Sequence, residues 1–189
     1  MTKYILHGGA AGRQSPDNKK FFLEIVNGLS DKVSLLCVLF AREKDNWDKS
    51  FEEVKTYFSS ASQQKVFSFV LANDKTSALV EQIKQADVIY LRGGNTHWLQ
   101  EHLAKIPDLI NLLNGKVVAG SSAGALVLSE YYYENDDDTY NKGLGILPIK
   151  TFCHYAEEKS DKLKKLKEFG ENIETIYTIP EEKFFIIEQ

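Results

Sequence analysis

The stretch Gly120-Ser121-Ser122-Ala123-Gly124-Ala125 places a serine between two glycines, directly after an apolar run. The residues before it, 116–119, form a short buried-strand pattern, and residues 125–128 can begin a helix. A strand that turns sharply into a helix leaves no room for side chains beside the turn, and glycine meets that requirement. The pattern predicts that Ser122 stands at the tip of the turn as a nucleophile. A closely packed turn of small residues is the alternative.

Short apolar runs alternate with amphipathic stretches over the first two thirds of the chain. The apolar runs predict strands at 4–6, 33–40, 66–70, 88–91 and 117–119. The amphipathic stretches predict helices at 19–29, 50–59, 77–86, 96–103 and 107–113. This alternation predicts an α/β fold with a mostly parallel, doubly wound sheet. The mixed pattern after Ser122 contains no long linker, so residues 1–189 are expected to form one domain.

Composition excludes several classes of function. The chain has 189 residues, 43% of them hydrophobic, and a net charge of -4, which gives no electrostatic case for binding nucleic acid or an anionic membrane. The apolar run near the N-terminus is too short for a signal peptide, and no segment is apolar enough to span a membrane, so a cytoplasmic location is expected. The two cysteines lack the spacing of a disulfide scaffold or a zinc site. Neither a metal cluster nor a nucleotide-binding fingerprint is recognisable, so no cofactor is expected, whereas an apolar edge near the C-terminus would suit a homodimer.

Three glycine-bearing turns follow predicted strands: residues 7–9, residues 92–96 and the turn at Ser122. In open parallel sheets, ligands bind beyond the carboxyl ends of the strands. The three turns are therefore expected on one rim of the sheet. This expectation supports a site there independently of the serine motif.

A serine hydroxyl needs a base, usually an imidazole that a carboxylate orients. His154 is the best candidate among the four histidines, because it ends a short extended segment downstream of Ser122. From the residues alone, the orienting carboxylate is either one of Asp136, Asp137 and Asp138 in the acidic loop, or Glu181.

Acyl transfer also needs donors for the oxyanion. The backbone N–H of Ala123, directly after the candidate nucleophile, is expected to be one donor. Gly93 or Gly94 is expected to supply the second, because a glycine backbone can approach a substrate closely.

Several of these segments together resemble a known family, the serine peptidases that include peptidase E, an aspartyl dipeptidase, and cyanophycinase. The matching segments are Gly93-Gly94-Asn95-Thr96, residues 120–125, residues 143–148, His154-Tyr155 and Ile179-Pro180-Glu181. The resemblance implies a fold like that of class I glutamine amidotransferases, with serine in place of cysteine.

The resemblance also implies roles for individual residues. Ser122 would be the nucleophile and His154 the base, and Glu181 is favoured over Asp137 as the acid. The substrate would be a small peptide, a dipeptide with an N-terminal aspartate.

Substrate contacts are expected from three residues after the fourth predicted strand. Asn95 and Thr96 belong to the segment that resembles peptidase E. Arg92 is the arginine nearest the expected rim, and a guanidinium suits the acidic side chain of such a substrate.

Two other functions compete with this one. An α/β-hydrolase esterase shares the serine motif, but Ser122 and His154 lie too close in sequence for the strands that usually separate them. A catalytically degenerate amidotransferase-like domain would keep the turn for packing and bind a metabolite or another subunit. Labelling of Ser122 by a fluorophosphonate would count against the second.

Overall fold

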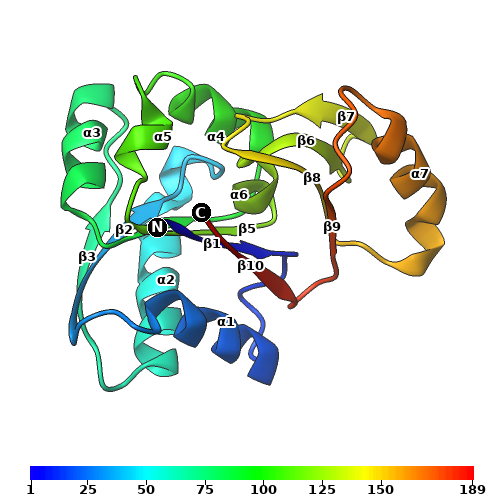
Figure 1. Cartoon of the computed structure of the whole chain (residues 1–189). Coiled ribbons are helices and arrows are strands. Elements are labelled where there is room, and N and C mark those ends of the chain that lie inside the picture. The colour runs from blue at the N-terminus through cyan, green and yellow to red at the C-terminus, as the bar shows by residue number, and fades with distance from the viewer.

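A six-stranded sheet runs through the middle of the molecule in the computed structural model, which describes residues 1–189 (Figure 1). In spatial order its strands are β10 (Phe184–Glu188), β1 (Lys3–His7), β5 (Val117–Ser121), β4 (Val88–Leu91), β2 (Lys32–Val38) and β3 (Val66–Leu71). All neighbouring pairs are parallel except β10 with β1. The carboxyl ends of β1, β4 and β5 therefore meet at one edge, where ligands bind in sheets of this kind.

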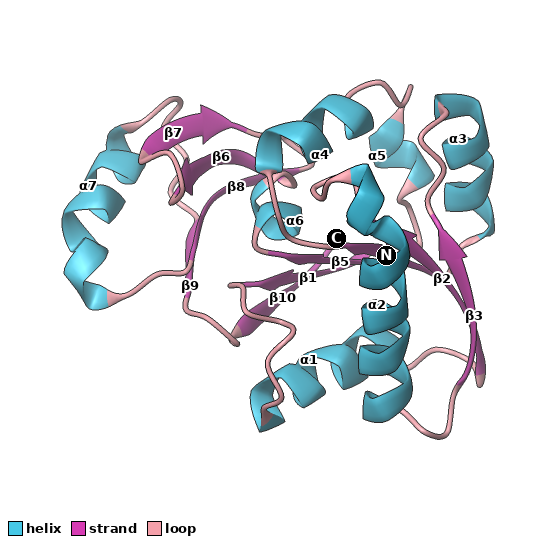
Figure 2. Cartoon of the chain, turned by 180° about the vertical axis from the view of Figure 1, so that it is seen from behind, coloured by secondary structure: helices cyan, strands magenta, loops and turns pink.

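Helices cover both faces of this sheet (Figures 1 and 2). One face carries α1 (Pro16–Val26) and α2 (Trp47–Ala61), and the other carries α3 (Thr76–Gln85), α4 (Thr96–Leu103), α5 (Leu109–Leu112) and α6 (Ala123–Leu126). Local signals set the starts of two of them. The Ser15 side chain caps α1 by accepting from the Asn18 N–H, with Pro16 at the first helical position, and Asn95 caps α4.

A second, four-stranded sheet lies beyond α6. Its order is β7 (Thr139–Lys142), β6 (Ser129–Glu134), β8 (Leu147–Cys153) and β9 (Ile176–Ile179), and α7 (Ser160–Glu168) packs beside it. The remaining helical turns are the short η1 (Lys44–Asn46) and η2 (Glu157–Lys159). Strands β8 and β9 are parallel, with Cys153 opposite Ile179. The residues that follow these two strands therefore come out side by side.

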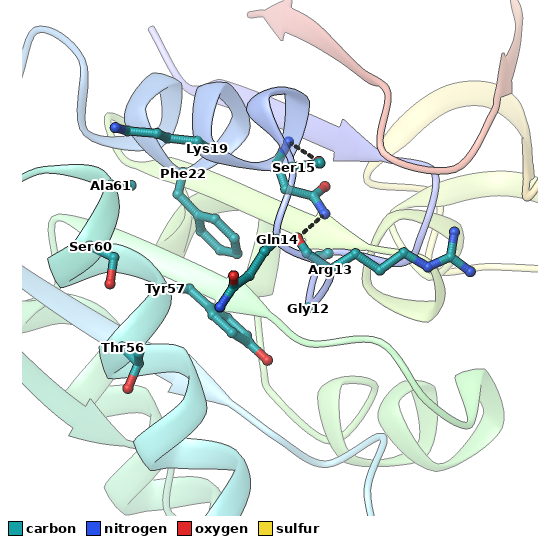
Figure 3. Close-up of a pocket in the computed structure, with 12 residues that line it drawn as sticks. Gly12, Arg13, Gln14, Ser15, Lys19, Phe22, Thr56, Tyr57, Ser60 and Ala61 are labelled. Carbon is teal, nitrogen blue, oxygen red and sulfur yellow. Dashed lines mark hydrogen bonds between the residues drawn. The ribbon is translucent and has the colours of Figure 1, made fainter.

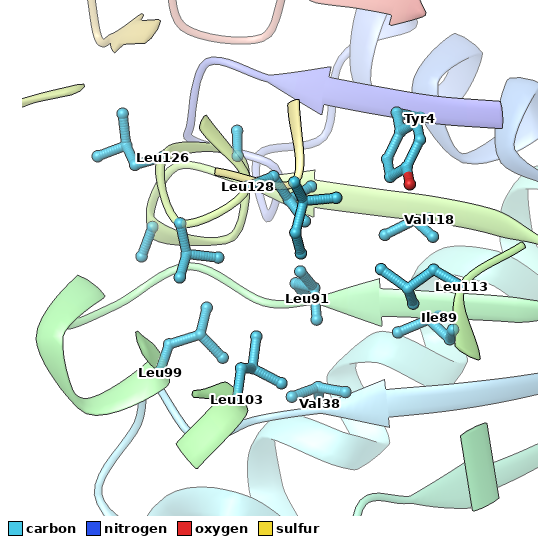
Figure 4. Packing of buried hydrophobic residues seen from close by; sticks show 14 of the residues in the cluster. Tyr4, Val38, Ile89, Leu91, Leu99, Leu103, Leu113, Val118, Leu126 and Leu128 are labelled. Carbon is cyan, nitrogen blue, oxygen red and sulfur yellow. The ribbon is translucent and has the colours of Figure 1, made fainter. Parts of the chain in front are cut away.

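The central sheet separates two hydrophobic cores. The larger contains 28 buried residues on the side of α3, α4 and α6, and Figure 4 shows Leu99 and Leu103 of α4 close to Val38 and Leu91 of the sheet. The smaller contains 16 buried residues, among them Phe21, against α1 and α2. Burial on both faces explains why the central strands are nearly continuous apolar runs.

The α/β fold with a mostly parallel sheet is confirmed, and each predicted strand lies within two residues of an observed strand at both ends. The predicted helix at 107–113 is wrong in its start, because Asp108 takes a left-handed φ of 53° and the helix begins after it. Residues after Ser122 add a separate sheet, not further parallel strands. None of the helices has the length and apolar character needed to cross a membrane.

Candidate active site

Ser122 occupies a strained turn between β5 and α6. Its backbone has φ 51° and ψ -114°, a combination that L residues rarely adopt. The Ser122 N–H donates to the carbonyl of His7 (2.9 Å), and the Ser122 carbonyl accepts from the N–H groups of Ala125 and Leu126. The turn is therefore held from β1 and from its own helix, which fixes the direction of the hydroxyl.

The two glycines of the motif are required by packing, as the sequence suggested. A Cβ at Gly120 would lie 2.7 Å from the nitrogen of Ala125, and a Cβ at Gly124 would lie 2.8 Å from the Cβ of Leu91. Real Cβ atoms do not approach so closely. The short distance between strand and helix therefore excludes any larger residue at both positions.

His154 lies directly at the Ser122 hydroxyl. It follows β8, and its Nε2 is 2.8 Å from Ser122 Oγ. Its N–H donates to the carbonyl of Gly8 (2.9 Å), and Lys159 Nζ donates to its carbonyl (2.9 Å). Backbone contacts from the end of β1 and the residue after it thus hold Ser122 and His154 in place.

Glu181, at the turn between β9 and β10, is the carboxylate beside His154. Its Oε1 lies 3.0 Å from His154 Nδ1, and its Oε2 accepts a hydrogen bond from Arg13. The hydrogen bond from His154 is the main cause that lowers the pKa of Glu181 below its ordinary value, with Arg13 adding to it and partial burial opposing it. Because an ionised carboxylate accepts from Nδ1–H, the lone pair of Nε2 faces Ser122.

Asp137, the other predicted acid, lies elsewhere. Its side chain is exposed and lies 3.9 Å from Nε2 of His97. The structure therefore brings together Ser122, His154 and Glu181, and it does not bring Asp137 to His154.

Two of the predicted oxyanion donors, Ala123 and Gly93, lie next to Ser122. Ala123 is the first residue of α6, so its N–H has no acceptor inside the helix. Gly93 lies against Ser122, because a Cβ there would be 3.1 Å from the Cβ of Ser122. Gly94 packs on the backbone of Ala41 and lines the same cavity as Ser122.

A cavity of about 410 Å³ opens at Ser122, within the size range of small-molecule sites. Its wall is formed by Ala10, Ala11, Gly12, Arg42, Tyr57, Tyr90, Arg92, Gly93, Gly94, Ser121, Ser122, Asp136 and His154. Arg92 is part of this wall, as expected, although its guanidinium donates to Glu53 Oε2 (2.5 Å) and to the carbonyl of Ser50 (2.8 Å). Its positive charge is therefore paired inside the protein.

Asn95 and Thr96 are not part of the cavity wall, although the sequence suggested substrate contacts for both. Asn95 accepts from the Trp98 N–H at the start of α4, and buried Thr96 donates to Glu134 Oε2 (2.5 Å). These hydrogen bonds tie α4 to its preceding turn and to β6. Both side chains thus serve the framework of the Gly93 turn.

Sequence analysis missed a buried network beneath the site. The side-chain amide of Asn18 donates to the carbonyls of Ala10 and Arg13. This fixes Oδ1 as the atom that faces His7, where it accepts from Nε2–H (2.9 Å). The Nδ1 of His7 then accepts from the Gly9 N–H (3.1 Å) and faces the hydroxyl of Ser121 (3.2 Å). Burial lowers the pKa of His7 to about 4, so its ring is neutral at pH 7. The His7-Gly8-Gly9 turn was visible in the sequence, but its partner Asn18 carried no signal.

A second cavity of about 380 Å³ adjoins the first, sharing Ala11, Gly12 and Tyr57 with it. Figure 3 shows Tyr57 and Phe22 at its centre, with Ser60 and Thr56 of α2 along one side. Neither cavity contains a metal centre, because no group of three or more His, Cys, Asp or Glu side chains is placed to hold an ion. Both cysteines are free and buried.

The model of peptidase family S51 matches residues 4–189. The chain belongs to peptidase family S51. It is a serine peptidase, and this membership excludes the α/β-hydrolase esterase considered from the sequence.

Individual proteins agree with the S51 assignment. The uncharacterized peptidase YgaJ of Bacillus subtilis (strain 168) is 29% identical over 176 residues, which cover 84% of this chain and 71% of YgaJ. A crystal structure of a peptidase from an acI-B1 Actinobacterium has a TM-score of 0.68 at 21% identity, covering 99% of this chain and 83% of that one. A candidate peptidase E protein from Listeria monocytogenes EGD-e also has a TM-score of 0.68, at 20% identity, covering 99% and 94%. These two structures share the fold of this S51 peptidase.

Proposed function

We propose that this S51 peptidase hydrolyses dipeptides with an N-terminal aspartate through an acyl-enzyme formed on Ser122. The observation that carries the proposal is the continuous chain of hydrogen bonds from Ser122 Oγ to His154 Nε2 (2.8 Å) and from His154 Nδ1 to Glu181 Oε1 (3.0 Å). Nucleophile, base and orienting acid within hydrogen-bond reach form the arrangement that activates a serine.

In the first half of the reaction, His154 Nε2 takes the proton of Ser122 as Oγ attacks the carbonyl carbon of the peptide. Glu181 stabilises the imidazolium that forms, because its carboxylate accepts from Nδ1–H. The N–H groups of Ala123 and of Gly93 or Gly94 stabilise the negative oxygen of the tetrahedral intermediate. His154 then gives its proton to the leaving amine, and the C–N bond breaks.

In the second half, water attacks the acyl-enzyme and His154 takes its proton. The tetrahedral intermediate collapses, the Ser122 oxygen leaves with the proton from His154, and the free acid departs. A cavity of about 410 Å³ gives room for a small peptide beside Ser122, which agrees with a dipeptide substrate.

The aspartyl preference is inferred from the likeness to peptidase E. It is supported by two arginines in the cavity wall, Arg92 and Arg42, since a guanidinium binds a carboxylate through two parallel hydrogen bonds. The charge of Arg92 is paired with Glu53, so the guanidinium of the wall that has no ion pair is that of Arg42.

The test compares wild type with Ser122→Ala on a library of dipeptides. We expect hydrolysis of aspartyl dipeptides by wild type and a loss of about 10⁶-fold in kcat in the variant. A fluorophosphonate should label wild type and leave Ser122→Ala unlabelled. Equal hydrolysis by both proteins would refute the proposed role of Ser122, and hydrolysis without aspartyl preference would refute the substrate class.

A further inference from the structure

The cavity beside Ser122 contains one positive and one negative side chain that are both unpaired. Its charged wall residues other than His154 are Arg42, Arg92 and Asp136. Arg92 is neutralised by Glu53, as its hydrogen bond of 2.5 Å shows. The electrostatic character of the cavity therefore depends mainly on Arg42 and Asp136.

Arg42 lies in the loop after β2 and is fixed at one end only. Its Nε donates to the carbonyl of Gly93 (2.6 Å), which holds the guanidinium beside the Gly93 turn. Its two terminal nitrogens make no hydrogen bond or ion pair within the chain. Partial burial, and then repulsion from Arg92, lowers the pKa of Arg42 below its ordinary value. The outer edge of this guanidinium is thus free to bind an anion in the cavity.

Asp136 is the one member of the acidic loop without a partner. Asp138 is held by Lys162 and by Tyr133 (2.9 Å), and Asp137 has His97 at 3.9 Å. Asp136 forms neither a hydrogen bond nor an ion pair within the chain, yet it lines the cavity. Its carboxylate is free to bind a cation.

An N-terminal aspartyl residue carries two charges on adjacent carbons, an α-ammonium and a side-chain carboxylate. An opposite charge in the cavity is available for each. We propose that Arg42 binds the side-chain carboxylate of the substrate's first residue and that Asp136 binds its α-ammonium group. This inference rests on the proposed function for its substrate, and it assigns the selectivity to Arg42 and Asp136.

The first experiment measures binding without turnover. In the Ser122→Ala background, the affinity for an aspartyl dipeptide is compared by calorimetry with that for the matching asparaginyl dipeptide, which has the same shape without the charge. We expect the preference for the aspartyl peptide to fall about 10- to 100-fold on adding Arg42→Gln, as for loss of hydrogen bonds to a charged group. Lys44→Gln is the matched control, because Lys44 follows β2 in the same segment as Arg42 but does not line the cavity. Its ammonium pairs with Asp74.

Asp136 is tested with a second pair of ligands, the aspartyl dipeptide with a free and with an acetylated amino group. We expect Asp136→Asn to reduce the preference for the free amine about 10-fold or more, with the carboxylate preference retained. Asp137→Asn is the matched control, since Asp137 is the adjacent exposed carboxylate that does not line the cavity.

The outcomes separate this inference from the proposed function. An aspartyl preference that persists in Arg42→Gln, or equal losses for both peptides, would overturn the role of Arg42. An unchanged preference for the free amine in Asp136→Asn would overturn the role of Asp136. Charge-dependent binding together with a wild type that hydrolyses no aspartyl dipeptide would instead refute the proposed function and leave the binding assignment standing.

Discussion

Replacing Gly9 by alanine should disable the site while leaving the fold in place. Gly9 has φ 115°, and its α-carbon faces the ring of His154. A Cβ there would lie 2.1 Å from Cε1 of His154, so reaching the 3.4 Å of ordinary van der Waals contact requires a displacement of about 1.3 Å. The hydrogen bond of 2.8 Å between His154 Nε2 and Ser122 Oγ does not survive a movement of that size.

The expected loss follows from this displacement. A catalytic group moved by about 1 Å costs on the order of 10²-fold in rate. The assay is kcat/KM on an aspartyl dipeptide, together with the rate of fluorophosphonate labelling of Ser122. Both should fall about 100-fold or more in Gly9→Ala.

Alanine at a positive φ also strains the backbone, so the comparison needs a control with that strain alone. Gly28 has φ 80°, and a Cβ there would meet nothing within 4 Å. Gly28→Ala should lose about 1–2 kcal/mol in the free energy of unfolding from backbone strain. Gly9→Ala should lose at least as much, because its Cβ also meets the ring of His154. Activity of Gly9→Ala within about threefold of Gly28→Ala would refute the claim that close packing of Gly9 positions His154.

Two further predictions concern the groups around the site. His7 has a pKa of about 4 in the folded protein and 6.5 as its ordinary value, so the unfolded chain binds more protons between these pH values. The contribution of His7 to the free energy of unfolding should therefore be constant above pH 6.5 and fall by roughly 3 kcal/mol as the pH drops to 4. Denaturant unfolding of His7→Gln should lack this pH-dependent loss. The same pH profile in wild type and His7→Gln would contradict the prediction. Glu181→Gln should lower kcat by about 10³- to 10⁴-fold, because the amide no longer fixes the tautomer of His154, whereas Asp137→Asn should stay within about twofold of wild type. A larger loss in Asp137→Asn than in Glu181→Gln would reverse the assignment of the acid.

The central sheet was predictable because its inner strands β1, β5, β4 and β2 are largely buried on both faces and read as apolar runs. The turn at Ser122 was predictable for a related reason, since only glycine fits between β5 and α6. The second sheet could not be predicted as such. Its strand β8 contains Pro148 and buried Lys150, whose ammonium donates to the carbonyls of Lys167 (2.8 Å) and Phe169 (2.7 Å) at the end of α7. A charge that is buried through backbone contacts distant in sequence leaves no periodic pattern.

The site residues also differ in whether local sequence or the pairing of distant strands places them. Ser122 was indicated by local sequence, because its turn is a local structure. Residue types alone could not separate Glu181 from Asp137, since the choice depends on the pairing of β8 with β9, which brings the residues after Cys153 and Ile179 together. Arg42 gave no signal at all, because its proximity to Gly93 arises from the order of strands in the sheet.

The pairing of β1 with β10 has a consequence for synthesis of the protein. Strand β1 and the residue after it supply the carbonyls that hold Ser122 and His154. The Gly8 N–H donates to the carbonyl of Lys183, and the Gly9 carbonyl accepts from the N–H of Glu182. A growing polypeptide whose residues 181–183 are still inside the ribosome lacks the Glu181 carboxylate beside His154. It also lacks the hydrogen bonds that residues 182 and 183 form with Gly9 and Gly8. The geometry around His154 therefore depends on the pairing of β1 with β10, and it forms only once residues 181–183 are available to fold.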